Sequence, residues 1–199
     1  MKAVRVNRTG GPEVLEVADI PLPQPGPGEA LVRLKAAGVN FIDIYIRKGY
    51  YERVLPLTPG MEGAGVVEAV GEGVREVNPG DRVAYAGHLG SYAQYSIVKA
   101  FQLIPLPVDI RFEQGAAFPL QGMTAHYLTQ EFFKIKPGDT VLVHAAAGGV
   151  GLHLVQRLKH MNARVIGTVS TPEKAKIARE AGADEIILYT REDFVERTL

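Results

Sequence analysis

The chain has 199 residues, no cysteine, and 22 basic against 22 acidic side chains, so its formal net charge is zero. The lack of cysteine excludes disulfides, thiolate nucleophiles and zinc sites with Cys ligands. The balanced charge argues against a nucleic acid or an anionic membrane surface as partner, and no apolar run is long enough to span a membrane. We therefore expect a cytoplasmic globular protein.

Residues 1 to about 120 are punctuated by Pro and Gly, with short β-rich runs between the turns. The predicted strands lie in AVRV, EALVRLKAAGV, GAGVVEAVG, DRVAYAG and SYAQYSIV. Turn signals such as PLPQPGPGE and EGVREVNPGD separate them. Many short strands of this kind predict an all-β barrel or sandwich.

From Phe118 onward the pattern changes to alternating helices and strands. A helix is predicted in PLQGMTAHYLTQEFFKI, and three apolar runs, TVLVH, ARVIGTV and DEIILY, are typical of buried parallel strands. Helices are predicted after each strand, in GLHLVQRLKHM, in STPEKAKIAREAGA with Ser170 or Thr171 as N-cap, and in REDFVERTL. This order predicts half of a doubly wound parallel sheet.

A glycine-rich loop follows the first of these strands, in HAAAGGVGLHLVQ. Gly148, Gly149 and Gly151 stand at the junction of strand and helix, while Ala146 replaces the first glycine of the G-x-G-x-x-G fingerprint. Gly148 would let the backbone approach a diphosphate, and Gly151 would let the helix pack closely on the strand. The pattern indicates a dinucleotide site, with a tight turn that binds no ligand as the alternative.

The end of the second strand carries the signal for the kind of nucleotide. NAD-binding proteins usually place Asp or Glu there to bind the ribose 2′-hydroxyl. Here the stretch is VIGTVSTPEK, with Ser170 and no acid at that place, and Lys174 one helical turn later. A missing carboxylate and a nearby cation favour NADPH, although Ser170 could be an ordinary N-cap and Lys174 a solvated lysine. Tyr189, at the end of the third strand, lies where ligands bind in such sheets.

The histidines give no sign of a metal site. They are His88, His126, His144, His153 and His160, and none is paired with carboxylates at a metal-ligand spacing. We expect His144, at the end of a buried strand, to be a core histidine with satisfied hydrogen bonds.

Several runs together resemble the zinc-independent, ζ-crystallin-like quinone oxidoreductases of the medium-chain dehydrogenase/reductase superfamily. These runs are AAGVNFIDIYIRKGYY, PGMEGAGVVEAVGEGV, PGDRVAY, AAAGGVG and GTVSTPEKAKIAREAGADEIILY. The resemblance implies an α/β plus β fold, with a GroES-like β-barrel catalytic domain over residues 1–121. A partial Rossmann domain that binds NADP would follow over residues 122–199. It also implies a homodimer that reduces quinones or related enones with NADPH.

The same resemblance implies roles for individual residues. Zinc relatives carry Cys where this chain has Asn40, and Gly-His-Glu where it has Gly60, Met61 and Glu62, so a metal-free site is implied. Asn40 and Tyr51 would be catalytic, by hydrogen-bonding the substrate oxygen as negative charge develops on it. The residues that would bind the cofactor are Asn40, Tyr45, Thr124, Gly149, Val150, Ser170, Lys174 and Tyr189, with Gly148 and Gly151 added by the fingerprint.

The family pattern continues beyond the last residue of this chain with the second half of the Rossmann sheet. We therefore expect either a truncated form or association that covers the open sheet edge. An NADPH-dependent quinone reductase is the first interpretation. A reductase of other enones or enoyl substrates, and a non-catalytic NADPH-binding or structural protein, are the alternatives.

Overall fold

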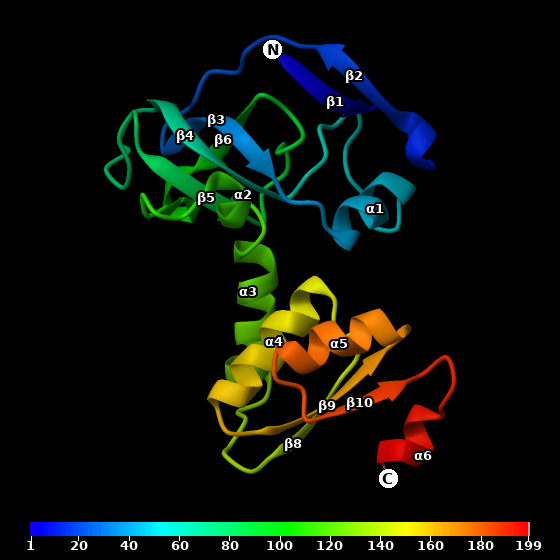
Figure 1. Cartoon of the computed structure of the whole chain (residues 1–199). Helices are drawn as coiled ribbons and strands as arrows, with labels where there is room; N and C mark the ends of the chain where they lie inside the picture. The colour runs from blue at the N-terminus through cyan, green and yellow to red at the C-terminus, as the bar shows by residue number, and fades with distance from the viewer. Residues whose placement is uncertain (199) are drawn as a thin grey trace. The chain divides into compact units, whose positions relative to one another are not determined.

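The computed structural model describes residues 1–198, so Leu199, the last residue of the final predicted helix, lies outside it. The chain divides after Leu120 into two compact units, Met1–Leu120 (unit 1) and Gln121–Leu199 (unit 2). Unit 1 is built from antiparallel strands, and unit 2 from a parallel sheet with helices (Figure 1). No helix among the described residues is long and apolar enough to cross a membrane.

Unit 1 contains a five-stranded antiparallel sheet in the order β6-β3-β4-β5-β7. Its strands are β3 (Glu29–Ala37), β4 (Glu62–Val70), β5 (Arg82–Ala86), β6 (Tyr95–Lys99) and β7 (Ile104–Pro105). A separate antiparallel ribbon pairs β1 (Lys2–Val6) with β2 (Leu15–Asp19). The predicted runs contain five of these strands but miss β2 and β7. Strand β2 exposes most of its side chains, so it lacks an alternating apolar pattern, and β7 has only two residues.

Short helices and a valine-rich core complete unit 1. Helix α1 (Phe41–Lys48) begins after Asn40 and ends at Gly49, whose φ of 81° is left-handed and favours glycine. The other helical segments are α2 (Phe112–Gly115) and the 3₁₀ turns Pro12–Val14 and Ala100–Gln102. Fully enclosed side chains from β3, β4, β5 and β6 form the core, among them Val32, Val67, Val83, Tyr85 and Val98.

Unit 2 has the predicted parallel sheet, in the order β10-β9-β8. Its elements are β8 (Thr140–Val143), α4 (Gly149–His160), β9 (Arg164–Val169), α5 (Pro172–Glu180), β10 (Glu185–Leu188) and α6 (Phe194–Thr198). Helices α4 and α5 lie on the same face of the sheet (Figure 1). The cluster between them and the strands includes Val155, Leu158, Val165 and Val169. Alternation of strand and helix brings the carboxyl ends of all three strands to one edge.

The long helix predicted from residue 119 is shorter than expected. Helix α3 (Pro119–His126) passes into π-helical turns over Tyr127–Phe132. Thr129 lies in these turns, and its Oγ1 is 2.8 Å from the Ala125 carbonyl oxygen and 2.7 Å from Arg157 Nε. A hydroxyl bonded to the preceding turn bends a helix, and its partner Arg157 is far away in sequence.

Candidate functional site

The glycine loop ends in a helix N-terminus with uncapped N–H groups. Gly148 is the N-cap of α4, in extended conformation, and has no side chain that could cap the helix. The first backbone N–H with a helical acceptor is that of Leu152, 2.8 Å from the Gly148 carbonyl oxygen. The N–H groups of Gly149, Val150 and Gly151 therefore point out of a twelve-residue helix. Together with the helix dipole they form a place that suits an anion.

Two of the glycines have close neighbours where a Cβ would lie, but only at Gly151 are these neighbours backbone atoms. A Cβ on Gly151 would lie 2.2 Å from the Ala145 carbonyl oxygen and 2.9 Å from Ala146 Cα, and this backbone has little freedom to move. A Cβ on Gly149 would lie 2.1 Å from Gln121 Oε1. The side chain of Gln121 on α3 therefore lies against the first residue of α4. No sequence motif includes Gln121, and its only signal is its position shortly before Thr124.

The replaced glycine of the fingerprint does not need a left-handed backbone. Ala146 is fully buried and donates its N–H to the Thr168 carbonyl oxygen at 3.1 Å. The residue before it, Ala145, has a φ of 51° instead. An alanine at position 146 is thus compatible with the loop. The left-handed conformation, which favours glycine, is at Ala145.

The structure brings Ser170 and Lys174 together where β9 leads into α5. Lys174 Nζ is 3.1 Å from Ser170 Oγ, and the ammonium forms no ion pair with any of residues 1–198. Of the two predicted N-caps the structure uses Thr171, whose Oγ1 accepts the Lys174 N–H at 3.3 Å. Ser170 is therefore not the cap, and its hydroxyl lies beside the cation.

A hollow of about 420 Å³ lies at the carboxyl ends of the strands of unit 2. Its lining is His144, Ala145, Thr168, Tyr189 and Phe194. Tyr189 is half exposed, at 51%. The expectation that His144 is a core residue is wrong, because its side chain is exposed. Its Nδ1 is 3.1 Å from Thr168 Oγ1 and its ring contacts Phe194 edge-on, so it lines the hollow rather than the core.

In unit 1, Asn40 belongs to a buried polar network. Its Nδ2 donates to Glu62 Oε2 at 2.9 Å, and the other Glu62 oxygen accepts the Leu120 N–H at 2.8 Å. Glu62, on β4, has no exposed surface. Burial raises the pKa of Glu62, while the hydrogen bonds from Asn40 and Leu120 oppose that rise and nearby Asp43 adds to it. In the sequence, Glu62 is notable only because it stands where the zinc relatives have the Glu of their Gly-His-Glu run.

Asp43 holds the backbone at the start of α1. Its Oδ2 accepts the Asn40 N–H at 2.9 Å and the Tyr92 hydroxyl at 2.8 Å. Burial raises the pKa of Asp43, and it also raises the pKa of Tyr92, which Asp43 raises further. Asn40 is therefore tied through its backbone to Asp43 and through its side chain to Glu62.

The tyrosines predicted beside Asn40 lie in an exposed aromatic group. The rings of Tyr45 and Tyr51 meet edge to face at 6.1 Å between centroids, and Tyr50 and Phe41 also contact Tyr45. Tyr51 is 50% exposed. Thr124, the remaining predicted residue, lies half-buried on α3 in unit 2.

The predicted residues thus form two groups, one in each unit. Asn40 is the N-cap of α1, and Tyr45 on α1 contacts Tyr51, which follows that helix. The glycine loop, Ser170, Lys174 and Tyr189 lie at the carboxyl edge of the parallel sheet. In the part of the chain that is described, no three His, Cys, Asp or Glu side chains are grouped so as to hold a metal ion.

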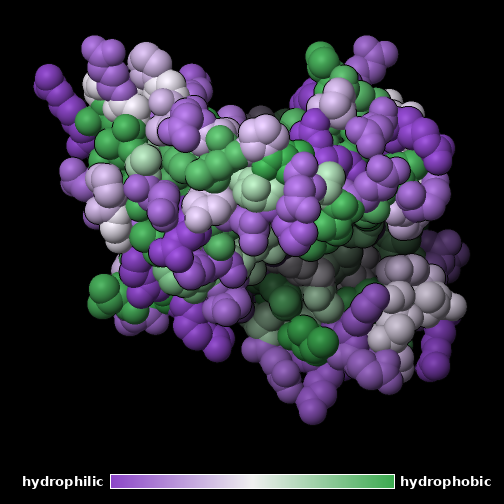
Figure 2. All heavy atoms as spheres, turned by 90° about the horizontal axis from the view of Figure 1, so that it is seen from above, coloured by the Kyte–Doolittle hydropathy of each residue, from purple (hydrophilic) through white to green (hydrophobic). Residues whose placement is uncertain are grey.

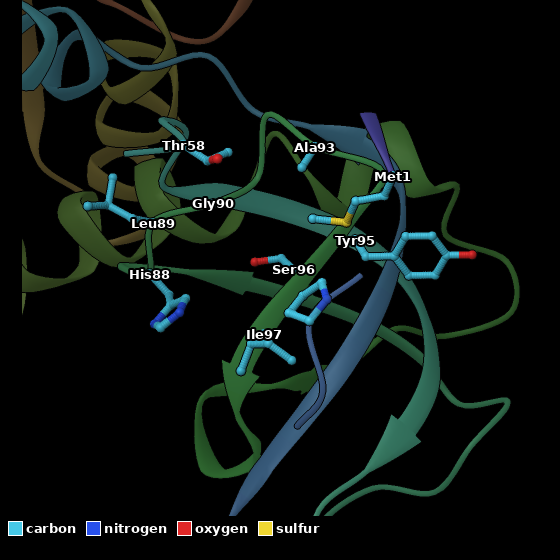
Figure 3. Close-up of a pocket in the computed structure, with 10 residues that line it drawn as sticks. Met1, Thr58, His88, Leu89, Gly90, Ala93, Tyr95, Ser96 and Ile97 are labelled. Carbon is cyan, nitrogen blue, oxygen red and sulfur yellow. The ribbon is translucent and has the colours of Figure 1, made fainter. Parts of the chain in front are cut away.

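A second hollow, of about 210 Å³, lies in unit 1 and contains none of the predicted residues (Figure 3). It is lined by residues such as His88 and Ser96, and burial lowers the pKa of His88. On the face shown in Figure 2, hydrophobic and hydrophilic side chains are interspersed.

Comparison with known proteins gives the family. Residues 26–108 match the alcohol dehydrogenase GroES-like domain, and residues 149–199 match the zinc-binding dehydrogenase family. A quinone oxidoreductase of Pseudomonas aeruginosa is 48% identical over 200 residues, a match that covers 100% of this chain and 62% of the relative. The chain belongs to the medium-chain dehydrogenase/reductase superfamily. Its superfamily membership confirms the predicted fold class, a GroES-like domain followed by a Rossmann-like parallel sheet.

Two further relatives of this chain show the range of activities described for such proteins. The crystal structure of Escherichia coli quinone oxidoreductase complexed with NADPH superposes with a TM-score of 0.96 at 45% identity, covering 99% of this chain and 61% of that one. A 2-haloacrylate reductase of Burkholderia is 42% identical, over 98% of this chain and 60% of the relative. The chain therefore spans about three fifths of the length of the curated relatives it matches.

Proposed function

We propose that this chain is part of an NADPH-dependent reductase that acts on quinones or related conjugated carbonyl compounds without a metal ion. In this proposal residues 1–121 are the catalytic domain and residues 122–199 the NADP-binding domain. The observation that carries it is the pair of Lys174 and Ser170, a cation without an ion-pair partner among residues 1–198 beside a hydroxyl that caps no helix. Such a pair suits a phosphate monoester on the ribose.

The residues of unit 2 fit a dinucleotide phosphate. The N–H groups of Gly149, Val150 and Gly151 are free of helical acceptors and suit the diphosphate. Only a residue without Cβ fits at Gly151, because a side chain would meet the backbone of Ala145. We place the adenosine end near Tyr189, which lines the hollow at the carboxyl edge of the sheet. Thr124 stays a proposed cofactor contact.

NADPH, when bound, supplies a hydride to an electrophilic carbon of the substrate. In our proposal the chain's own residues then have to orient the reactants, exclude water and supply hydrogen bonds. Tyr51 is half exposed, and its hydroxyl would donate to the substrate oxygen as negative charge develops there. Tyr45 packs edge to face against Tyr51 and limits where its ring can lie. Asn40 is the third proposed contact.

Metal-free chemistry is supported by the residue types at the positions of the zinc relatives' ligands. Asn40, Gly60 and Met61 do not provide the thiolate or imidazole that zinc prefers. Glu62, the one carboxylate of this set, is already hydrogen-bonded to Asn40 and Leu120. We also propose that the protein is cytoplasmic and forms a homodimer, the assembly that the resemblance to the family implies.

Selectivity between NADPH and NADH tests the proposal. Lys174→Gln removes the cation, so we expect the Kd for NADPH to rise roughly ten-fold or more, because a hydrogen bond between two charged groups is lost. The Kd for NADH should stay unchanged. Fluorescence titration of the purified protein with both nucleotides measures this.

Lys176→Gln is the matched control, since Lys176 is on the same helix with a highly exposed side chain. It should leave both constants unchanged. Equal weakening of NADPH and NADH by Lys174→Gln would contradict the assignment. Oxidation of NADPH with a quinone, or with a 2-haloacrylate, then identifies the substrate class, and binding without turnover of either would favour a non-catalytic NADPH-binding protein.

A further inference from the structure

Arg47 is a buried cation of unit 1 that has no partner in the described chain. It lies in the last turn of α1, and 8% of the residue is exposed. Its guanidinium group has several N–H donors and no acceptor, and it forms neither a hydrogen bond nor an ion pair with any of residues 1–198. Arginine is rarely buried to this degree unless it is paired, because the charged group loses its hydration. The side chain therefore needs an acceptor other than these residues.

The nitrogens of the guanidinium differ in how far they are enclosed. Nη1 of Arg47 is fully enclosed and has no hydrogen-bond partner, whereas Nε and Nη2, which also lack a partner among the described residues, are not fully enclosed. Nε and Nη2 share one edge of the planar group, where their N–H bonds run parallel and match the two oxygens of a carboxylate. The open edge of Arg47 is therefore suited to bind one carboxylate through both oxygens.

Arg47 lines a hollow of about 210 Å³ beside α1, which we call the Arg47 hollow. None of the described residues that line it is proposed above to contact the cofactor or the substrate. Asp43 and Tyr92 contribute to the lining, and the rest is apolar: Pro12, Leu15, Val39, Ile44 and Pro59. Pockets for drug-sized ligands usually measure about 300–1,000 Å³. The Arg47 hollow therefore suits a smaller molecule with a short hydrocarbon chain.

Two carboxylates of the chain lie near Arg47 without pairing with it. Asp43, one helical turn earlier, lines the same hollow, but its Oδ2 already accepts two hydrogen bonds and its Oδ1 is fully enclosed. Glu13 accepts the Gly11 N–H at 2.8 Å. Backbone hydrogen bonds lower the pKa of Glu13 most, and the Arg47 charge lowers it least. A ligand in the hollow meets the charges of Arg47 and Asp43 together, so a monoanion is favoured over a dianion such as phosphate.

We propose that Arg47 anchors a binding site for a small monocarboxylate with a short apolar chain. Nε and Nη2 of Arg47 donate to the two carboxylate oxygens, and the apolar wall of the Arg47 hollow contacts the hydrocarbon part. This site lies within unit 1 and needs neither NADPH nor the parallel sheet, so it is independent of the proposed reductase activity.

Isobutyrate and its neutral isostere isobutyramide test the site in the whole chain. In heteronuclear NMR titrations, isobutyrate should shift the Arg47 Nε–H and the backbone amides of α1 in a saturable way. Isobutyramide should bind roughly ten-fold more weakly, because a charged acceptor is lost, and inorganic phosphate should not bind. Equal affinity for the acid and the amide, or for isobutyrate and phosphate, would overturn the proposal. So would a titration with isobutyrate that never saturates, which would leave ordered water as the partner of Arg47.

Arg47→Met removes the charge and keeps a side chain of similar length. Lys48→Met is the matched control, because Lys48 is an exposed cation in the same turn of α1. Arg47→Met should abolish isobutyrate binding, and Lys48→Met should leave it unchanged. Undiminished binding in Arg47→Met would refute the assignment of Arg47 as the anchor.

Urea denaturation gives a second readout that needs no NMR assignment. Both variants lose a cation that interacts favourably with the C-terminus of α1, but only Arg47→Met removes an unpaired buried charge. Without ligand, Arg47→Met should therefore have the higher urea midpoint of the two. Isobutyrate should raise the midpoint of the unmodified protein and of Lys48→Met but not of Arg47→Met. A midpoint of Arg47→Met below that of Lys48→Met would show that Arg47 stabilises the fold instead, and would contradict the proposal.

Discussion

Two adjacent alanines at the end of β8 have different backbone conformations. Ala145 has a φ of 51°, while Ala146 is outside the left-handed region and fully buried. A left-handed conformation costs a residue with a Cβ roughly 1–2 kcal/mol, and glycine avoids this strain. Glycine also loses more conformational entropy on folding, which offsets part of the stabilisation. We expect Ala145→Gly to raise the free energy of unfolding of unit 2 by up to about 1 kcal/mol. Urea denaturation measures it.

Ala146→Gly is the control next to it in sequence. It removes a buried methyl group and adds freedom to the unfolded chain, so the free energy of unfolding should fall by about 1 kcal/mol or more. A loss of stability in both variants would contradict the conformational argument. Opposite signs would show why the fingerprint tolerates alanine at its first position.

At the scale of elements, Asp184 joins α4, β9 and β10. Its oxygens are 2.8 Å from Lys159 Nζ, and Oδ2 is 2.7 Å from the Val165 N–H. These hydrogen bonds lower the pKa of Asp184 from its ordinary value of 3.8, and the one from Lys159 has the largest effect. Because the folded pKa lies below the unfolded one, this stabilisation is complete above the unfolded pKa and is lost as the pH falls through the folded pKa.

Asp184→Asn should therefore lower the free energy of unfolding at pH 7 by about 1 kcal/mol, a modest value because the side chain is partly solvated. The difference from the unmodified protein should shrink when the pH falls below about 4. Urea denaturation at pH 7 and at pH 3 tests both parts. An equal difference at the two pH values would refute the role of the ionised carboxylate. Glu180→Gln, on an exposed and loosely paired carboxylate, serves as control.

At the scale of the whole molecule, each unit has its own hydrophobic core. Leu158 is fully buried in the core of unit 2, and Val98 is fully buried in the core of unit 1. We expect Leu158→Ala to lower the stability of unit 2 by about 2–5 kcal/mol through lost contacts and a cavity. Amide hydrogen exchange should then speed up in β8, β9 and β10 and stay unchanged in β3 and β4.

Val98→Ala should give the reverse pattern of exchange, with β3 and β4 affected and the parallel sheet protected. If either variant accelerates exchange equally in every strand, the two units unfold together. The same measurement with NADPH present should slow exchange in unit 2, since a ligand stabilises the folded state that binds it.

The parallel sheet was the part best predicted from sequence. Buried parallel strands are short continuous apolar runs, and α4 and α5 show helical periodicity. In α5, Thr171 is the N-cap and Pro172 is the first helical residue. Other features needed distant contacts. Exposed β2 has no apolar pattern, α3 changes character at Thr129 where Arg157 contacts it, and His144 is exposed although it follows a buried strand.

For the candidate site, the sequence by itself determined the residue types: glycines at a strand–helix junction, a lysine without an acid at the end of β9, and asparagine in place of a zinc ligand. These are local patterns, and local backbone geometry expresses them directly. Only the tertiary structure decided that Glu62 holds Asn40 and that Gln121 lies on Gly149. Packing brings those residues together from distant parts of the sequence, and no local periodicity encodes it.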